Sequence, residues 1–237
     1  MMPQKRIPCR LGRQHTMISQ MTNKILIWLF AVMTAVTGWA VDLNEIEVDV
    51  KMHPGKFREL LERFEQADTT LTPSELATVY FGYSYTTDYD PRETFPQVES
   101  AYDSGDYELT ETLGLEAMEL NPVSLDLNVL ALAAADHMRD KGTYGPKILK
   151  YGIRCDLIAT AILESGSGTS ASSPFYVISS ADMSRILRNV LGIDRIVDRT
   201  KVGDVDAIKV TFPGSDRQHI LYFNNNRERQ FFSSHPL

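Results

Sequence analysis

The stretch LTPSEL, residues 71–76, decides the fold of the first half of this chain, because it marks where a helix begins. Thr72 and Glu75 have the three-residue spacing of a capping box, in which each side chain accepts a hydrogen bond from a backbone N–H of the first turn. Pro73 stands at the first helical position, where its missing N–H costs nothing. The two flanking leucines are spaced as a hydrophobic staple. We expect a helix that starts here and carries a dense aromatic run.

The residues on either side agree with this start. Upstream, Phe57, Leu60, Leu61 and Phe64 follow the i, i+3, i+4, i+7 spacing of one apolar helical stripe, which begins near Pro54. Downstream, the aromatic helix is expected to end before residues 88–91, because a residue that precedes proline disfavours the helical conformation. The first half of the chain is therefore predicted to be helical.

The next segment resembles a tetratricopeptide repeat. The residues that carry the likeness are Ala101-Tyr102, Gly105-Asp106-Tyr107 and 116–122, EAMELNP. The resemblance implies two antiparallel helices joined at residues 105–107, with Ala117 as a small packing residue and Asn121-Pro122 closing the second helix. Thr110 departs from the small Ala of the family pattern.

A second, weaker unit follows, with helices predicted over 130–138 and 148–163 and a turn at 142–144. The two turns begin 37 residues apart by residue number, close to the usual repeat of about 34. Such arrays need about three repeats to bury their core, so something else must seal the stack.

The remaining chain is predicted to seal it. A small-residue connector, 166–174, precedes a buried strand at 175–178 and an amphipathic helix at 181–191. Three β-like runs follow at 195–200, 205–212 and 219–223, the last two separated by a turn at 213–216. We therefore predict an α+β fold in two parts. Tetratricopeptide-like helical hairpins occupy residues 41–165, and a small antiparallel sheet with one helix, residues 166–237, packs on them as a cap.

Residues 24–40, KILIWLFAVMTAVTGWA, have the layout of a secretory signal peptide. Lys24 is the positive flank, and Gly38 and Ala40 are the small residues that a signal peptidase reads. The apolar run is shorter than the roughly 20 residues of a transmembrane helix. We expect residues 21–40 to be the leader, cleaved after Ala40; an uncleaved N-terminal anchor is the alternative. The protein is then exported to the periplasm or the extracellular space, with no membrane span left after cleavage.

Residues 1–20 contain four basic residues, no acidic residue and no apolar period. We expect Met21, or Met17, to be the initiator and residues 1–20 to be an extension that the native protein lacks. A basic nucleic-acid arm is the functional alternative, but it would be removed with the leader.

Cleavage removes five of the 24 Lys and Arg and none of the 31 Asp and Glu, which changes the formal charge from −7 to about −12. Such a surface repels phosphate backbones, which argues against a nucleic-acid partner. Cys155 is the one cysteine that remains, in an apolar helical stretch, and we expect it to be buried and unreactive.

The order of these segments is similar to a family of short exported proteins from Bacteroidota that is described only as a domain of unknown function. The strings that carry this resemblance are 64–72 (Phe64 through Asp68-Thr69-Thr70-Leu71-Thr72), Tyr80-Phe81-Gly82, Gly105-Asp106-Tyr107, 121–125, 165–168 and 175–178. The resemblance implies the compartment and the two-part architecture, and no activity.

Four tyrosines are the candidate binding residues: Tyr80, Tyr83, Tyr85 and Tyr89. Helical geometry separates Tyr80 and Tyr83 from Tyr85, so one packed face is not expected to bury every ring. Rings left outside would contact a peptide or a sugar. Core packing against the second helix pair or the sheet is the alternative.

No catalytic residue, cofactor or metal site is predicted. Asp136, His137 and Asp140 lie within a turn and a half of one helix, but no second histidine stands at ligand spacing. The Ser165–Ser170 loop lacks the elbow of a hydrolase nucleophile. The sequence favours an envelope scaffold that binds a protein, peptide or glycan. An envelope hydrolase with a site between helices and sheet is the alternative, and it requires a Ser, His or acid pair to meet in one pocket.

Overall fold

The computed structural model describes residues 41–91, 95–142 and 144–236, and these residues belong to one compact unit. The predicted leader at 21–40 and the extension at 1–20 lie outside the described residues.

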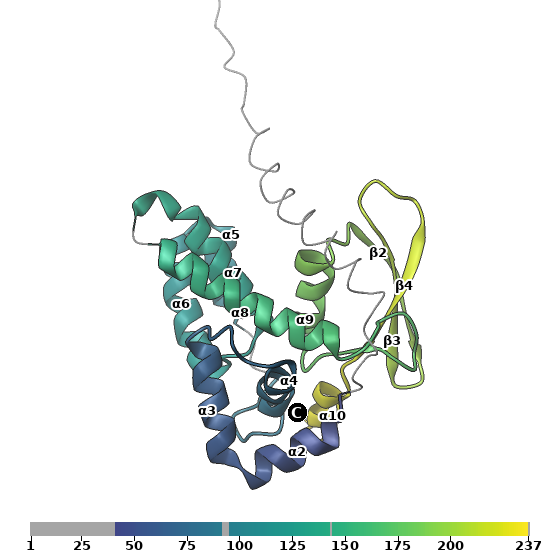
Figure 1. Ribbon diagram of the computed structural model, residues 1–237. Coiled ribbons are helices and arrows are strands. Elements are labelled where there is room, and N and C mark those ends of the chain that lie inside the picture. Colours follow the sequence, from purple (N-terminus) through teal and green to yellow (C-terminus); the bar gives the residue numbers. More distant parts are fainter. Residues whose placement is uncertain (1–40, 92–94, 143, 237) are drawn as a thin grey trace, which may run out of the picture. The chain divides into compact units, whose positions relative to one another are not determined.

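Helices occupy the first two thirds of the described chain (Figure 1). They are α2 (Leu43–Met52), α3 (Pro54–Glu65), α4 (Pro73–Tyr83), α5 (Pro96–Asp103), α6 (Tyr107–Leu120), α7 (Leu125–His137), the short 3-10 helix η1 (Arg139–Lys141) and α8 (Gly145–Glu164). The C-terminal third contains β1 (Phe175–Tyr176), α9 (Ser180–Arg185), the π-helical turn η2 (Ile186–Val190), β2 (Arg195–Val202), β3 (Val205–Thr211), β4 (Gln218–Asn224) and α10 (Asn226–Ser234). The predicted α+β architecture, with helices before the sheet, is confirmed.

The start of α4 is the capping box that the sequence predicts. The Thr72 backbone N–H donates to the Glu75 carboxylate at 2.7 Å, and the Glu75 N–H donates to Thr72 Oγ1 at 3.3 Å. Arg63 of α3 donates to the same glutamate and to Asp68, so the cap also holds α3 against α4. Two helix ends are thus fixed by one group of polar side chains.

The helix–turn–helix expected over residues 101–122 is present as α5 and α6, which pack against each other. Gly105 has φ of +79°, a left-handed conformation that favours glycine at the turn. Asp106 then caps α6 by accepting the Leu109 N–H at 3.1 Å. Ala117 is 3% exposed and belongs to a small core between α5, α6 and α7. From there α6 packs on α7, α7 on α8, and α8 on α4.

The four-stranded sheet has the order β1-β4-β3-β2. Adjacent strands β2, β3 and β4 are antiparallel, but β1 pairs with Phe223–Asn224 of β4 in parallel. The expectation of a purely antiparallel sheet is therefore wrong. The alternation of apolar residues reports which face of a strand is buried and carries no information on the direction of its neighbour, least of all for a two-residue strand.

The main apolar core crosses from the helices to the sheet. It contains Phe64, Tyr80 and Ile158 from the helical part together with Met183 and Ile208 from the C-terminal part. Both parts of the chain therefore bury apolar surface against each other.

Candidate binding pocket

Three of the four candidate tyrosines are inside the protein. Tyr80, Tyr83 and Tyr89 are 1%, 3% and 6% exposed. Their hydroxyls donate to partners in other segments: Tyr80 to Asp182 at 2.9 Å, Tyr83 to the Leu120 carbonyl and Tyr89 to the Ile178 carbonyl. For these three rings the structure has the core packing that the sequence left open as the alternative.

Segments that are distant in the sequence cover these rings. The segment before α9 packs over the aromatic end of α4, and Phe231 of α10 meets the Tyr89 ring edge-on at 5.6 Å. Because α4 ends at Tyr83, Tyr85 and Tyr89 lie beyond the helix, and segments distant in the sequence decide which of the rings are covered.

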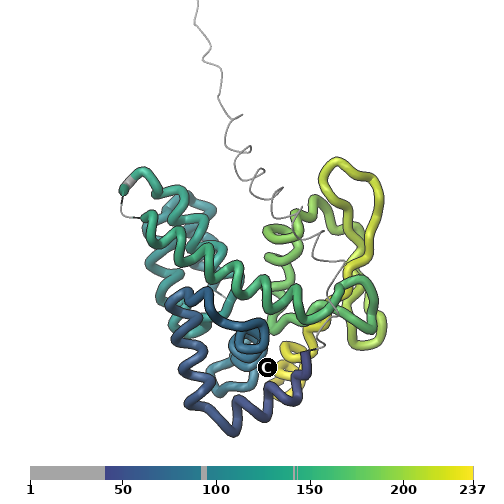
Figure 2. Tube along the Cα trace, in the orientation of Figure 1, coloured from purple at the N-terminus to yellow at the C-terminus, as the bar shows by residue number. Residues whose placement is uncertain are grey.

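Tyr85 is the exception, because it is half-buried and lines a pocket of about 510 Å³. Residues from four segments form the pocket wall: 41–44 and Glu47 at the start of α2, Phe81 of α4 and Tyr85 just after its end, Tyr176 and Val177 at β1, and Asn224, Asn226, Arg227 and Gln230 around the start of α10. Figure 2 shows why these meet: the first described helix and the C-terminal helix lie side by side.

The Tyr85 ring is held in place by Arg227. The guanidinium lies over the ring, 4.0 Å from its centroid. The same group donates to the Ser84 carbonyl at 2.6 Å, to Ser84 Oγ at 3.2 Å and to Gln230 Oε1 at 2.9 Å. Burial raises the pKa of the Tyr85 hydroxyl, so this group is neutral at physiological pH. A pinned aromatic ring loses little entropy when a ligand binds.

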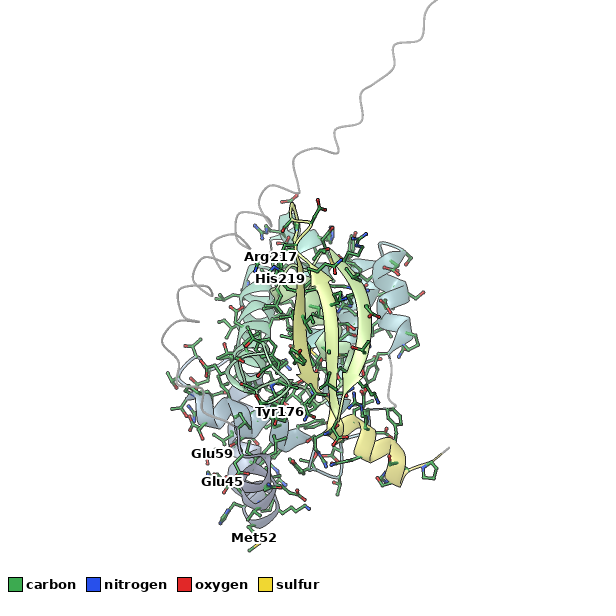
Figure 3. All side chains as sticks on the ribbon, turned by 90° about the vertical axis from the view of Figure 1, so that its right-hand side faces the viewer. Glu45, Met52, Glu59, Tyr176, Arg217 and His219 are labelled. Atoms are coloured by element: carbon green, nitrogen blue, oxygen red, sulfur yellow. The ribbon has the colours of Figure 1, made fainter. Side chains whose placement is uncertain are left out.

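Polar side chains complete the wall. Asp42 caps α2 by accepting the N–H groups of Asn44 and Glu45 at 3.0 and 3.2 Å. Glu47 pairs with Lys51. Asn224 Oδ1 accepts the Asn226 N–H at 2.9 Å, which orders the turn into α10. Tyr176 lies near the end of the sheet from which α10 continues, away from His219 at the other end (Figure 3).

The wall offers flat rings, carboxamides and carboxylates. None of the described residues that line it is Ser, His or Cys. These groups suit a ligand that stacks a ring and forms several hydrogen bonds.

A buried acid that the sequence analysis missed connects three elements. Asp182 of α9 is 1% exposed, and its carboxylate accepts hydrogen bonds from the Tyr80 hydroxyl at 2.9 Å, the Leu125 N–H at 2.8 Å and the Asp126 N–H at 3.3 Å. Burial raises its pKa to about 7. Ser179, three residues earlier, caps α9 by accepting the Asp182 N–H. This cap was the one feature of the nearby sequence that could have pointed to Asp182. Because protein encloses this carboxyl group, we assign Asp182 a structural role and not a catalytic one.

The other residues considered from the sequence have ordinary roles. The His137 ring stacks on Tyr107 with centroids 4.1 Å apart, and Asp136 pairs with Arg139. Among the described residues, no group of His, Cys, Asp or Glu is arranged to hold a metal. Cys155 is buried, as the sequence led us to expect, and burial raises its thiol pKa to about 12, which disfavours the reactive thiolate.

The fold and the pocket together define an α+β protein with a polar pocket that aromatic rings line in part. The chain belongs to the DUF4919 family, a domain of unknown function, whose model matches residues 44–233. No curated protein and no solved structure matches it. The family match carries neither the Bacteroidota origin nor the tetratricopeptide likeness, so both stay predictions. Within the described ranges, no helix is long and apolar enough to cross a membrane.

Proposed function

We propose that this protein is a non-catalytic binding protein of the cell envelope and that it holds a short glycan segment in the pocket beside Tyr85. The observation that supports this most is the Tyr85 ring, fixed by Arg227 in a pocket that Tyr176 and several carboxamides also line. A sugar ring has an apolar face that stacks on aromatic rings and a rim of hydroxyls that pair with amides and carboxylates. Both kinds of partner stand in this wall.

A peptide is the second ligand class that the sequence favours. We prefer a glycan because the pocket wall is mostly polar and because its aromatic rings can stack on the face of a sugar ring. The hydrolase alternative has less support. Of the two acids at the pocket, Asp42 caps α2 and Glu47 pairs with Lys51, so neither is placed to exchange a proton with a ligand.

The helical hairpins are proposed to act as a tetratricopeptide-like scaffold over residues 41–165, with residues 166–237 as the cap packed on it. In this arrangement the cap supplies the β1 and α10 walls of the pocket, and α2 and the end of α4 supply the rest. Binding would therefore require both parts.

Export is proposed on the layout of residues 24–40 alone. Mass spectrometry of the protein recovered from the envelope fraction is expected to find an N-terminus at or near Val41. An intact Met21 on a membrane-bound product would contradict the cleavage.

A printed glycan array tests the binding proposal. Full-length protein is expected to retain a defined set of glycans, and Tyr176→Ala is expected to lose them, because the variant removes a half-buried ring from the wall without emptying the core. Tyr222→Ala is the matched control, since Tyr222 is also half-buried but lies outside the pocket. The proposal fails if wild type retains no glycan, or if both variants bind as wild type does while melting normally.

A further inference from the structure

Strand β2 leaves one edge of the sheet open. It is the last strand in the order β1-β4-β3-β2, and all eight of its residues, Arg195–Val202, are exposed. Figure 3 shows the sheet with no described helix in front of it. An unpaired edge presents a row of backbone donors and acceptors that another extended chain can use.

The turn between β2 and β3 fixes which backbone groups point outward. Gly203 and Asp204 form a two-residue hairpin loop, and Gly203 has φ of +62°, as the first central residue of a type II′ turn requires. The closing pair Val202 and Val205 then exchanges hydrogen bonds within the hairpin, so Lys201 and Arg199 direct their N–H and C=O groups away from β3.

One contact agrees with this alternation. The Arg199 N–H donates to Asp198 Oδ1 at 2.8 Å, so it does not point into the β2–β3 ladder. Asp198 thereby occupies one of the outward donors, while Lys201 keeps its donor for another chain.

The edge is also basic, on a chain with an acidic balance of 31 Asp and Glu against 24 Lys and Arg. β2 contains Arg195, Arg199 and Lys201 against a single acid, Asp198. None of the three cations forms an ion pair within the part of the chain that the structure describes. Since Arg199 and Lys201 are two residues apart in a strand, their side chains stand on the same face.

We propose that the β2 edge binds an extended acidic segment of another protein by strand addition. The segment adds a fifth strand next to residues 198–202, and carboxylates at alternate positions lie beside Arg199 and Lys201. A bulge between Ile196 and Asp198 interrupts the regular ladder and limits the docking length to these five residues. Cationic edges discourage pairing between identical strands, which favours a different, acidic partner over a second copy. This inference does not depend on the glycan pocket.

The charge requirement is tested with a fluorescent peptide of sequence Thr-Glu-Val-Glu-Thr-Glu, titrated with the full-length protein and followed by anisotropy. The double variant Arg199→Glu with Lys201→Glu is expected to bind at least ten-fold more weakly, and to gain binding to the Lys-substituted peptide. Arg58→Glu with Lys150→Glu changes the net charge equally at exposed helical positions and should leave binding unchanged. Equal loss in this control would show that the attraction is only general charge and would overturn the proposal.

The backbone requirement is tested by comparing Lys201→Ala with Lys201→Pro. Both variants lose the charge, but only proline also removes the outward N–H, so Lys201→Pro is expected to bind the Glu peptide several-fold more weakly. Asp198→Ala frees the Arg199 N–H and removes the one repelling carboxylate, so it should tighten binding. Equal affinity of the Ala and Pro variants would overturn strand addition. A concentration-dependent dimer that Lys201→Pro abolishes would assign the edge to a second copy instead.

Discussion

Replacing Asp182 by Asn tests whether burial of its carboxyl makes the protein less stable as the pH rises. The folded state raises the pKa of Asp182 from 3.8 to about 7. Between these values the folded protein holds a proton that the unfolded chain has released. The free energy of unfolding contributed by this residue therefore falls as the pH rises through that window.

The size of the effect follows from the two pKa values. Each pH unit of difference corresponds to about 1.4 kcal/mol, so the contribution changes by at most roughly 4 kcal/mol between about pH 4 and pH 8. Asn keeps an oxygen for the N–H groups of Leu125 and Asp126 but cannot ionise. It also leaves the Tyr80 hydroxyl without its acceptor, a cost of about 1–2 kcal/mol that is the same at every pH.

Urea unfolding of wild type and Asp182→Asn at pH 4 and pH 8 measures this. Wild type is expected to be more stable than the variant by about 1–2 kcal/mol at pH 4 and to become the less stable protein by pH 8, because the pH-dependent loss of roughly 4 kcal/mol exceeds that advantage. Subtracting the free energy of unfolding of the variant from that of wild type removes the contribution of the carboxylates that both proteins share. Asp68 is one of these, and its lowered pKa of about 2 makes the protein more stable as the pH rises, which is the opposite of the effect of Asp182. Asp140→Asn, at an exposed site, is the control. The reasoning is refuted if the difference in free energy of unfolding between wild type and variant is independent of pH, or if wild type becomes more stable relative to the variant as the pH rises.

Two further predictions concern the helical part and its cap. Ala117→Glu places a carboxylate in the core between α5, α6 and α7, where the site is 3% exposed, and is expected to cost more than about 3 kcal/mol in urea unfolding; a wild-type stability would contradict the packing of this helix pair. A chain that ends at Ser165 loses Met183 and Ile208, which pack in the same core as Phe64 and Ile158, so it should be molten, with weak near-ultraviolet dichroism. Cooperative thermal unfolding of that shortened chain would show that the two parts are independent domains.

Local signals in the sequence predicted local structure well. The start of α4 follows from the capping box at Thr72, and the turn into α6 follows from the glycine at 105 and the residues around it. These features depend on groups within a few residues of each other, so short-range spacing contains the information. The burial of Cys155 followed in the same way from the apolar residues that surround it.

The candidate site could be predicted only in part. Tyr85 was chosen with three neighbours, and the structure separates it from them. The separation depends on α10 and the β1–α9 segment, which approach α4 from about 90 to 150 residues away along the chain. Arg227, which fixes the Tyr85 ring, carried no local signal at all.

The sequence by itself determined where α3, α4 and α6 begin. Each of these starts follows from capping residues and from the period of apolar side chains along one element. Tertiary structure alone decided the parallel pairing of β1, the enclosure of Asp182 and the pocket between α2 and α10. These features arise where segments distant in sequence meet, and a residue's own neighbours do not reveal which remote surface will cover it.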